Sequence, residues 1–254
     1  MWAGIVGMGL LVATSAFAGA GDGHQPAGVW LFEDGSGTEA ADATGNGLDG
    51  VFTGSPEWAD GKFGGGISLP GAGDTVAIEG YAGAISVDEL TITLWANVTD
   101  DKNQDIFSLE PLEPGRITSH MPWDNAVHWQ FGTPFTGIAP APLTDAVGAW
   151  KHWAYVHSVS ENRMTLYENG AEVSGGGVSS AYEHRDGGFH IGGRPGSSFA
   201  GVVDDFAIFP AVLSVAEINA IMTDGLAGAL GLGTTDVEAN AKLASVWGSL
   251  KASE

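Results

Sequence analysis

The stretch VVDDFAIF (Val202–Phe209) sets two adjacent carboxylates into an apolar run of strand type. Successive side chains of a strand point to opposite faces, so one of these aspartates must face a buried side. An isolated carboxylate is costly to bury unless it is hydrogen-bonded, paired or bound to a metal. Both faces of the run are otherwise apolar, so both are expected to be buried. One face can pack on the core of the sheet, and a helix expected over 214–222 would cover the other.

Short apolar runs divided by Gly, Pro, Asn and Asp recur along the chain and are typical of an all-β protein. Thirteen segments are predicted as strands: 28–32, 48–52, 66–70, 74–78, 90–98, 104–109, 115–120, 125–131, 151–159, 163–168, 171–175, 188–192 and 201–209. So many short strands in one domain need two packed sheets or a barrel to bury their faces. The turn pair Asn169-Gly170 predicts a hairpin between 163–168 and 171–175.

One helix is predicted near the end of the chain. Ser214-Val215-Ala216-Glu217 is a capping box, and Ile218, Ile221 and Met222 follow on one face. We expect a Gly-rich bridge from Gly225 to Gly233. The tail after it, DVEANAKLASVWGSLK, is compatible with a short amphipathic helix or with an appended strand.

The first segment, Met1 to Ala18, has the pattern of a secretory signal peptide. Its apolar stretch runs from Ile5 to Ala13, and it ends in Ala16-Phe17-Ala18, although no Lys or Arg precedes the apolar part. The alternative is a membrane anchor through this segment. We expect a signal peptide over 1–18, a short linker over 19–27, a β-sandwich domain over 28–224, and a bridge with a tail over 225–254, in a secreted protein.

The composition is acidic and lacks cysteine. The formal net charge is −22 at pH 7, which repels nucleic acid and anionic lipid surfaces and offers carboxylates to divalent cations. A solvated acidic surface accounts for most of these charges. Without cysteine there are no disulfides and no zinc sites of Cys type, so stability rests on the core and on any bound metal.

Four ordered blocks resemble the bacterial laminin-G-like, concanavalin A-like family. They are GVWLFEDGSGTEAADATGNGLDG (28–50), LTITLWANV (90–98), WKHWAYVHSVSENRMTLYENGAEV (150–173) and HIGGRPGSSFAGVVDDFAIFPAVLSVAEI (190–218). The resemblance implies an all-β fold: an antiparallel two-sheet jelly-roll β-sandwich with one short C-terminal helix. This fold carries lectins, adhesion modules and glycosidases, so it does not fix the function.

The resemblance also implies a structural calcium ion, with Asp42 and Asn46 in the loop and Asp204 in the last strand as ligands. Carboxylate, amide and carbonyl oxygens suit calcium, which takes about six to eight of them. On this hypothesis Asp204 turns toward the Asp42 loop, and Asp205 faces solvent or the helix, within reach of Arg194. The alternative is that Asp42 caps its own turn and Asp204 accepts backbone N–H bonds, with no metal.

The segment HMPWDNAVHW concentrates groups that suit a ligand site. The spacing His120-x3-Asp124-x3-His128 suggests a metal, but we expect a Pro-Trp turn that would not hold these residues on one face. Among functional interpretations, a sugar-stacking surface formed by Trp123 with Asp124 and His128 fits better than a metal site. The alternative places Trp123 as a packing plug under a long loop.

Arg194, in the Gly-rich loop GGRPGSS, is the fourth candidate ligand-binding residue. It has the geometry to bind a carboxylate or sulfate, but with so few cations in the chain a structural pairing with Asp204, Asp205 or another acid is favoured. The tryptophans at 30, 95, 129 and 153 lie in apolar strands and are predicted core residues.

No pair of acids alternates along one strand as in the glycosidases of this fold, so we expect a protein that is not an enzyme. The leading hypothesis is a secreted, lectin-like recognition module that binds a polysaccharide or glycoprotein glycan, with calcium as a structural ion. The alternatives are a structural or adhesive cell-surface protein with a protein partner, and a divergent glycosidase or lyase.

Overall fold

The computed structural model describes residues 24–232 apart from 72, 82–87, 111, 113–114, 133–135, 139–140, 144–146, 178–181, 183–186 and 195. The predicted signal peptide and the predicted tail lie outside these residues. No helix in the described part of the chain is long and apolar enough to cross a membrane.

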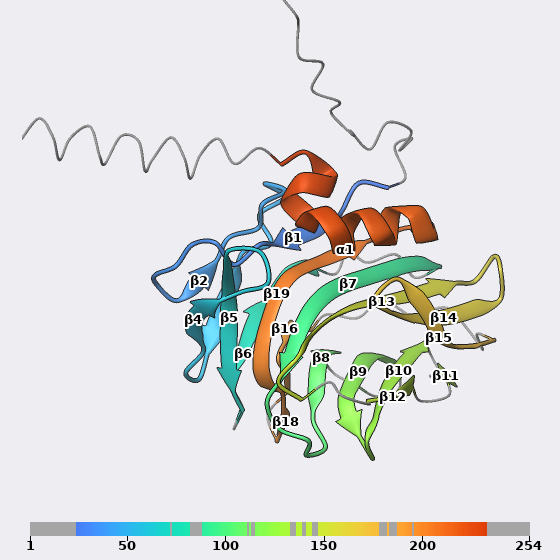
Figure 1. The fold of residues 1–254 in the computed structure, drawn as a ribbon, viewed down its shortest axis with the longest axis horizontal. Helices are drawn as coiled ribbons and strands as arrows, with labels where there is room; N and C mark the ends of the chain where they lie inside the picture. Colours follow the sequence, from blue (N-terminus) through green and yellow to red (C-terminus); the bar gives the residue numbers. More distant parts are fainter. Residues whose placement is uncertain are drawn as a thin grey trace, which may run out of the picture.

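Two sheets pack face to face, as the sequence predicts (Figure 1). The first contains β1 (Gly28–Trp30), β4 (Glu57–Asp60), β5 (Gly65–Pro70), β7 (Glu89–Val98), β13 (Trp150–Ser158), β14 (Arg163–Glu168), β15 (Ala171–Gly176) and β19 (Ala200–Phe209). The second contains β2 (Glu39–Ala40), β3 (Gly50–Thr53), β6 (Thr75–Ile78), β8 (Asp105–Leu109), β9 (Arg116–Trp123), β10 (Ala126–Gly132), β11 (Thr136–Gly137), β12 (Ala141–Pro142), β16 (Phe189–Ile191), β17 (Gly193–Arg194) and β18 (Ser197–Ser198).

All thirteen predicted strands are present, with ends shifted by a few residues. The strands that the sequence did not predict are β2, β4, β11, β12, β17 and β18, each of two to four residues. Such short pairings lack the alternation over four or more residues that reveals a strand. The predicted hairpin is confirmed: Asn169 and Gly170 have φ of 49° and 77°, and Glu168 pairs with Ala171.

The first and last strands of the sandwich are neighbours. Strand β19 lies between β7 and β5 and also pairs with β1, where Trp30 is opposite Phe206. Between the sheets, Phe107 contacts the rings of Trp129, Phe189 and Phe206. These large aromatic side chains are fully removed from water, and their burial is the main source of the sandwich's stability.

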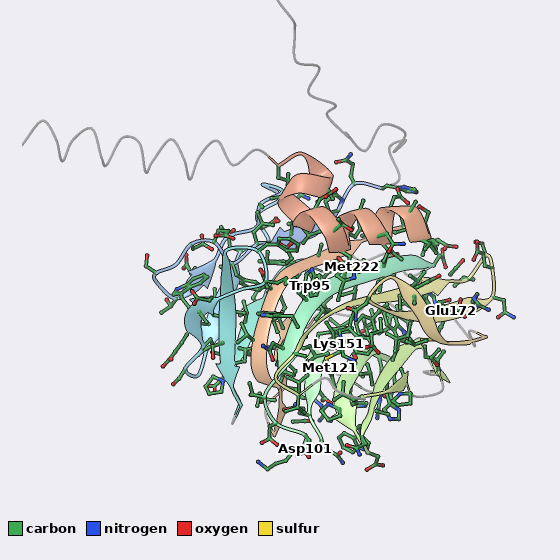
Figure 2. The ribbon with its side chains drawn as sticks, in the orientation of Figure 1. Trp95, Asp101, Met121, Lys151, Glu172 and Met222 are labelled. Carbon is green, nitrogen blue, oxygen red and sulfur yellow. The ribbon has the colours of Figure 1, made fainter. Side chains whose placement is uncertain are left out.

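Helix α1 (Val215–Leu230) covers the outer face of the first sheet (Figure 1), as the apolar outer face of β19 predicts. Ser214 and Glu217 form the predicted capping box. The apolar side of the helix, with Ile218 and Ile221 buried, packs in one cluster with residues of the sheet that include Ala207 and Phe209. Met222 is only partly buried, and Figure 2 shows it on the helix.

The expected Gly-rich bridge begins as helix instead. Gly225 takes φ of 70°, which breaks the helical path, and a second helical segment continues to Leu230. The segment ends at Gly231, whose φ of 65° is the left-handed conformation typical of a helix C-cap. Leu226 in this segment is fully buried, so its burial, rather than the helix propensity of a Gly-rich sequence, holds the segment in place.

Candidate functional site

The β9–β10 hairpin lies at the end of the sandwich opposite α1, toward the bottom of Figure 1. The same end carries Asp101, labelled in Figure 2. Asp124 and Asn125 form the two-residue turn, with φ of 50° and 63°, and Trp123 pairs with Ala126. Positive φ at both turn positions is the type I′ geometry that matches the twist of the strands.

This geometry corrects the prediction of a Pro-Trp turn. Pro122 and Trp123 belong to β9, and the turn follows them. His120 and His128 therefore lie directly opposite each other on neighbouring strands, with ring centroids 6.1 Å apart. Side chains opposite each other in a ladder share a face of the sheet. The two histidines share a face of the sheet, so the prediction that they would not is wrong.

A buried acid links the hairpin to the Gly-rich loop. Asp105 on β8 is opposite His120, and its Oδ1 is hydrogen-bonded to Nδ1 of that histidine. Its Oδ2 accepts a hydrogen bond of 2.8 Å from Nε of Arg194. Asp105 is fully buried; the Arg194 guanidinium compensates its charge, and the hydrogen bond to His120 satisfies its other oxygen. Arg194 thus pairs with an acid, as favoured from the sequence, but with Asp105 rather than Asp204 or Asp205.

Trp123 lies against His120 and is partly exposed. Its side chain is 36% exposed, which is unusual for a large apolar residue of this chain. The Trp123 ring lies 4.9 Å from the ring of His120, and Nε2 of His128 is 3.1 Å from the Trp123 carbonyl oxygen. Trp129, in contrast, is a core residue, as predicted, and so are Trp30 and Trp153. Trp95 is buried on the outer face of the first sheet (Figure 2).

A polar hollow of about 290 Å³ lies beside the hairpin. Its lining includes Asp100, Lys102, Asn103, Gln104 and Ser198. Asn103 connects it to the Trp123 face, because its Oδ1 accepts a hydrogen bond of 2.9 Å from the backbone N–H of Asp124. The carboxylate of Asp100 is paired with Lys102, so the pair adds no net charge to the hollow.

The structure thus brings together all four predicted ligand-binding residues, Trp123, Asp124, His128 and Arg194, around one end of the second sheet. Sequence reasoning missed Asp105, which joins them, and assigned His120 no part in the site. A signal was present: Asp105 opens the apolar run DIFSL, an acid in a predicted strand like the pair in VVDDFAIF.

The structure does not bring the three predicted calcium ligands together around one site. Both oxygens of Asp42 accept hydrogen bonds from its own loop and the adjoining strand: from the backbone N–H of Val29, Thr44 and Leu48 and from the Thr44 hydroxyl. The amide of Asn46 donates to the carbonyl of Ala27 at 3.0 Å. The hydrogen bonds of Asp42 match the alternative stated from the sequence, in which Asp42 caps its own turn.

Asp204 faces another loop. Its Oδ2 accepts hydrogen bonds from the backbone N–H of Lys62 (2.7 Å) and Phe63 (2.8 Å), and its Oδ1 accepts one from Asp205. The expectation that it turns toward the Asp42 loop is wrong. Because N–H donors surround both carboxylates, these residues do not fit one calcium site. Across the described ranges no group of three or more His, Asp or Glu side chains is arranged to hold a metal ion.

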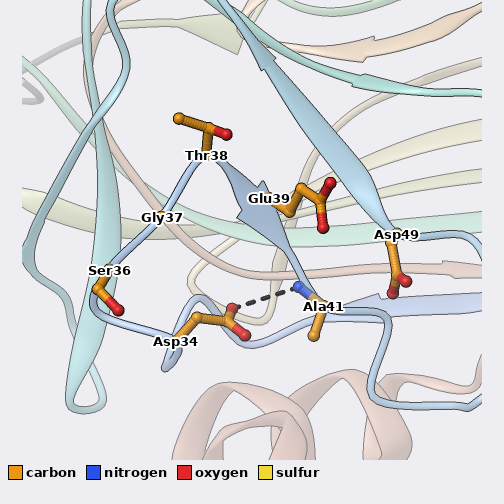
Figure 3. Close-up of a pocket in the computed structure, with 7 residues that line it drawn as sticks. All are labelled: Asp34, Ser36, Gly37, Thr38, Glu39, Ala41 and Asp49. Carbon is orange, nitrogen blue, oxygen red and sulfur yellow. Dashed lines mark hydrogen bonds between the residues drawn. The ribbon is translucent and has the colours of Figure 1, made fainter.

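A second hollow, of about 400 Å³, lies in the N-terminal loops (Figure 3). Asp34, Glu39 and Asp49 contribute its carboxylates. Oδ2 of Asp34 accepts from the Ala41 N–H, and Oδ1 of Asp49 accepts from the Asp42 N–H. Asp34 and Asp49 are therefore occupied in holding the loop around residues 34–49.

Comparison with known proteins places the chain in a family. A laminin-G-type family model, described as the concanavalin A-like lectin/glucanases superfamily, matches residues 70–219, more than half of the chain. The chain belongs to this superfamily, as its sequence blocks and its two-sheet jelly roll indicate. No curated protein sequence matches it.

Several solved structures share the fold. Domain 4 of AbnA, an extracellular GH43 arabinanase from Geobacillus stearothermophilus solved with arabinotriose, has a TM-score of 0.65 at 18% identity, covering 80% of this chain and all of that one. The binding domain of Paraclostridial Mosquitocidal Protein 1 has a TM-score of 0.65 at 14% identity, and the receptor-binding domain of a botulinum neurotoxin C/D mosaic 0.62 at 13%. Each of these two covers 78% of this chain, which spans about half of theirs.

Proposed function

We propose that this protein is a secreted, non-catalytic recognition module that binds neutral glycans at the β9–β10 end. One observation carries the proposal: Trp123 offers a partly exposed indole face, held in place by contact with His120, beside a polar hollow. An aromatic platform next to polar groups is how protein sites hold a sugar ring, whose C–H face stacks while its hydroxyls find hydrogen bonds.

The charges around the platform favour a neutral ligand. Arg194 is countered by Asp105, and Lys102 by Asp100, so no described cation at this end is left to attract an anion. The net charge of −22 repels acidic polysaccharides further. The likeness to a domain solved with arabinotriose, a neutral oligosaccharide, is in keeping with this ligand class.

The absence of catalysis is part of the proposal. In the described part of this site, the one buried carboxylate, Asp105, is committed to His120 and Arg194. A glycosidase needs two carboxyl groups free to reach one glycosidic bond. Reducing-end assays on arabinan and other neutral polysaccharides should therefore stay blank while binding is measurable.

The proposal is tested by calorimetric titration of the full chain with arabinotriose and with neutral xylo-, cello- and manno-oligosaccharides. At least one should bind, and Trp123→Ala should weaken that binding by about tenfold or more, as for a central aromatic contact. Trp58→Ala, which removes a partly buried tryptophan on the edge strand β4, is the matched control and should bind as wild type. Equal affinities in the two variants would refute a platform at Trp123.

A second candidate function is recognition of a cell-surface protein. It is favoured by the likeness to toxin domains described as receptor-binding, which concerns the fold alone at these identities. Binding of the chain to cells that survives complete enzymatic removal of surface glycans would support this function over the first.

A further inference from the structure

His120 and His128 face each other across β9 and β10, and neither is used as a charge in the proposed glycan site. Each has one ring nitrogen next to an oxygen that only accepts hydrogen bonds: the Asp105 carboxylate for His120 and the Trp123 carbonyl for His128. In a neutral ring the proton lies on the nitrogen beside such an acceptor. This leaves the lone pair on Nε2 of His120 and on Nδ1 of His128.

This arrangement is the one found around metal-binding histidines. Such residues donate the N–H of one ring nitrogen to a carboxylate or a backbone carbonyl, which fixes the ring and frees the other nitrogen for the metal. Here one histidine has the carboxylate and the other has the carbonyl.

The positions of the rings are close to those of two ligands that share an ion. An ion bound at about 2.0–2.1 Å from each nitrogen lies about 3.2 Å from each ring centre, so two rings that share it at a tetrahedral angle lie about 5 Å apart. The observed separation is 6.1 Å, so the partly exposed ring of His128 must turn toward His120 by about 1 Å to share the ion. Strand β9 lies between β8 and β10, and Nδ1 of His120 faces Asp105 on β8. The opposite edge of that ring, which carries Nε2, is therefore on the β10 side, where His128 lies.

We propose that His120 and His128 form an open site for a divalent transition-metal ion of the Zn²⁺, Ni²⁺ and Cu²⁺ class. Imidazole nitrogens suit these ions, whereas calcium and magnesium require oxygen ligands. Among the described residues no His, Asp or Glu side chain adds a third protein ligand there, so water or the oxygen of a ligand completes the coordination. The Asp105–Arg194 pair acts behind His120 as a positioning group and does not touch the ion.

The test titrates the untagged full chain with NiCl2, CuCl2 and ZnCl2 in the absence of any glycan. Calorimetry should show one saturable site per chain. His128→Gln, a change at a partly exposed side chain, should weaken binding by about tenfold or more. The matched control is His190→Gln, on β16, where the histidine contacts Thr75 rather than another histidine; it should bind as wild type.

A spectroscopic readout locates the ion. Cu²⁺ and Ni²⁺ quench nearby indoles, and the Trp123 ring lies 4.9 Å from that of His120. Saturable quenching should be reversed by Zn²⁺ and should shrink in Trp123→Phe while calorimetric binding persists. The proposal is overturned if wild type shows no saturable site, or if the His128 and His190 variants bind alike. Neither result touches the glycan proposal, because no sugar is present.

Discussion

The carboxylate of Asp205 accepts a hydrogen bond of 2.8 Å from the backbone N–H of Leu226, 21 residues further along the chain. Leu226 follows Gly225, where the helical path is broken, so its N–H opens the second segment of α1. A strand residue thus caps a helix segment, a task usually performed by the residue just before the helix. Asp204 and Asp205 have separate partners: the first fixes the loop at Lys62 and Phe63, and the second fixes the helix.

We expect Asp205→Ala to loosen the second segment of α1 selectively. The substitution removes the acceptor of the Leu226 N–H and places alanine at φ of 47°, where L-residues are strained by about 1–2 kcal/mol. Amide hydrogen exchange should speed up over 226–230 and stay unchanged over 218–224. Asp224→Ala, at an exposed acid of the same helix, is the control; equal effects of the two variants would contradict the capping role.

The stability of the fold should depend on pH through Asp204. Burial, with a smaller contribution from the neighbouring Asp205 charge, raises the pKa of Asp204 to about 7. Burial likewise raises the pKa of Asp205 to about 6. A carboxyl whose pKa is raised on folding holds its proton more tightly in the folded state. Its contribution to stability is therefore full below about pH 4 and is lost as pH rises through about 7.

The measurement compares urea unfolding of wild type and Asp204→Asn from pH 4 to pH 8. The stability of wild type relative to the variant should decrease as pH rises, by up to about 1.4 kcal/mol per pH unit. Burial lowers the pKa of His152 to about 3 and of His157 to about 4, which favours stability at higher pH, but both proteins share this effect. Parallel curves for the two proteins would contradict the assignment.

Removing the carboxylate that joins Arg194 to His120 should be costly. Asp105→Ala leaves the partly exposed Arg194 guanidinium and the buried ring nitrogen of His120 without their shared acceptor, and an unsatisfied buried polar group costs about 1–3 kcal/mol. The free energy of unfolding from urea titration should fall by this order. Asp100→Ala removes the acid of an exposed pair with Lys102 and should change stability little. A small loss for Asp105→Ala would mean that the pair is not formed in solution.

Calcium should not act through Asp204. The N–H donors of Lys62, Phe63 and Asp205 occupy its oxygens, so any change in melting temperature caused by calcium or by chelator should be the same in wild type and in Asp204→Asn. A calcium-dependent stabilisation present in wild type and absent from the variant would restore the calcium site implied by family resemblance.

Local patterns predicted the framework of the fold. The strands, the Asn169-Gly170 hairpin and the Ser214 capping box follow from periodicity and turn chemistry within a few residues. The capping by Asp205 could not be predicted from local patterns, because it joins a residue of β19 to a residue of α1 and Asp205 lies in a β-bulge. That bulge lies between Asp204 and Ala207, and it allows both acids to be buried, where alternation alone predicts one.

The residues of the candidate site could be predicted only where they stand close together in the sequence. Trp123, Asp124 and His128 stand together in one segment, and their types suggested a ligand surface. Their register depended on whether the turn falls at Pro122-Trp123 or at Asp124-Asn125, and a shift of this kind decides which side chains share a face. The contact of Asp105 with Arg194 spans 89 residues and has no local signal.

The most direct test of glycan recognition is an NMR titration of the ¹⁵N-labelled chain that follows the indole N–H signals during addition of the neutral oligosaccharide found to bind by calorimetry. The signal of Trp123, assigned by its loss in Trp123→Phe, should shift saturably, while those of the core residues Trp30 and Trp153 stay in place. Saturable binding that leaves the Trp123 signal unmoved would contradict the proposed site.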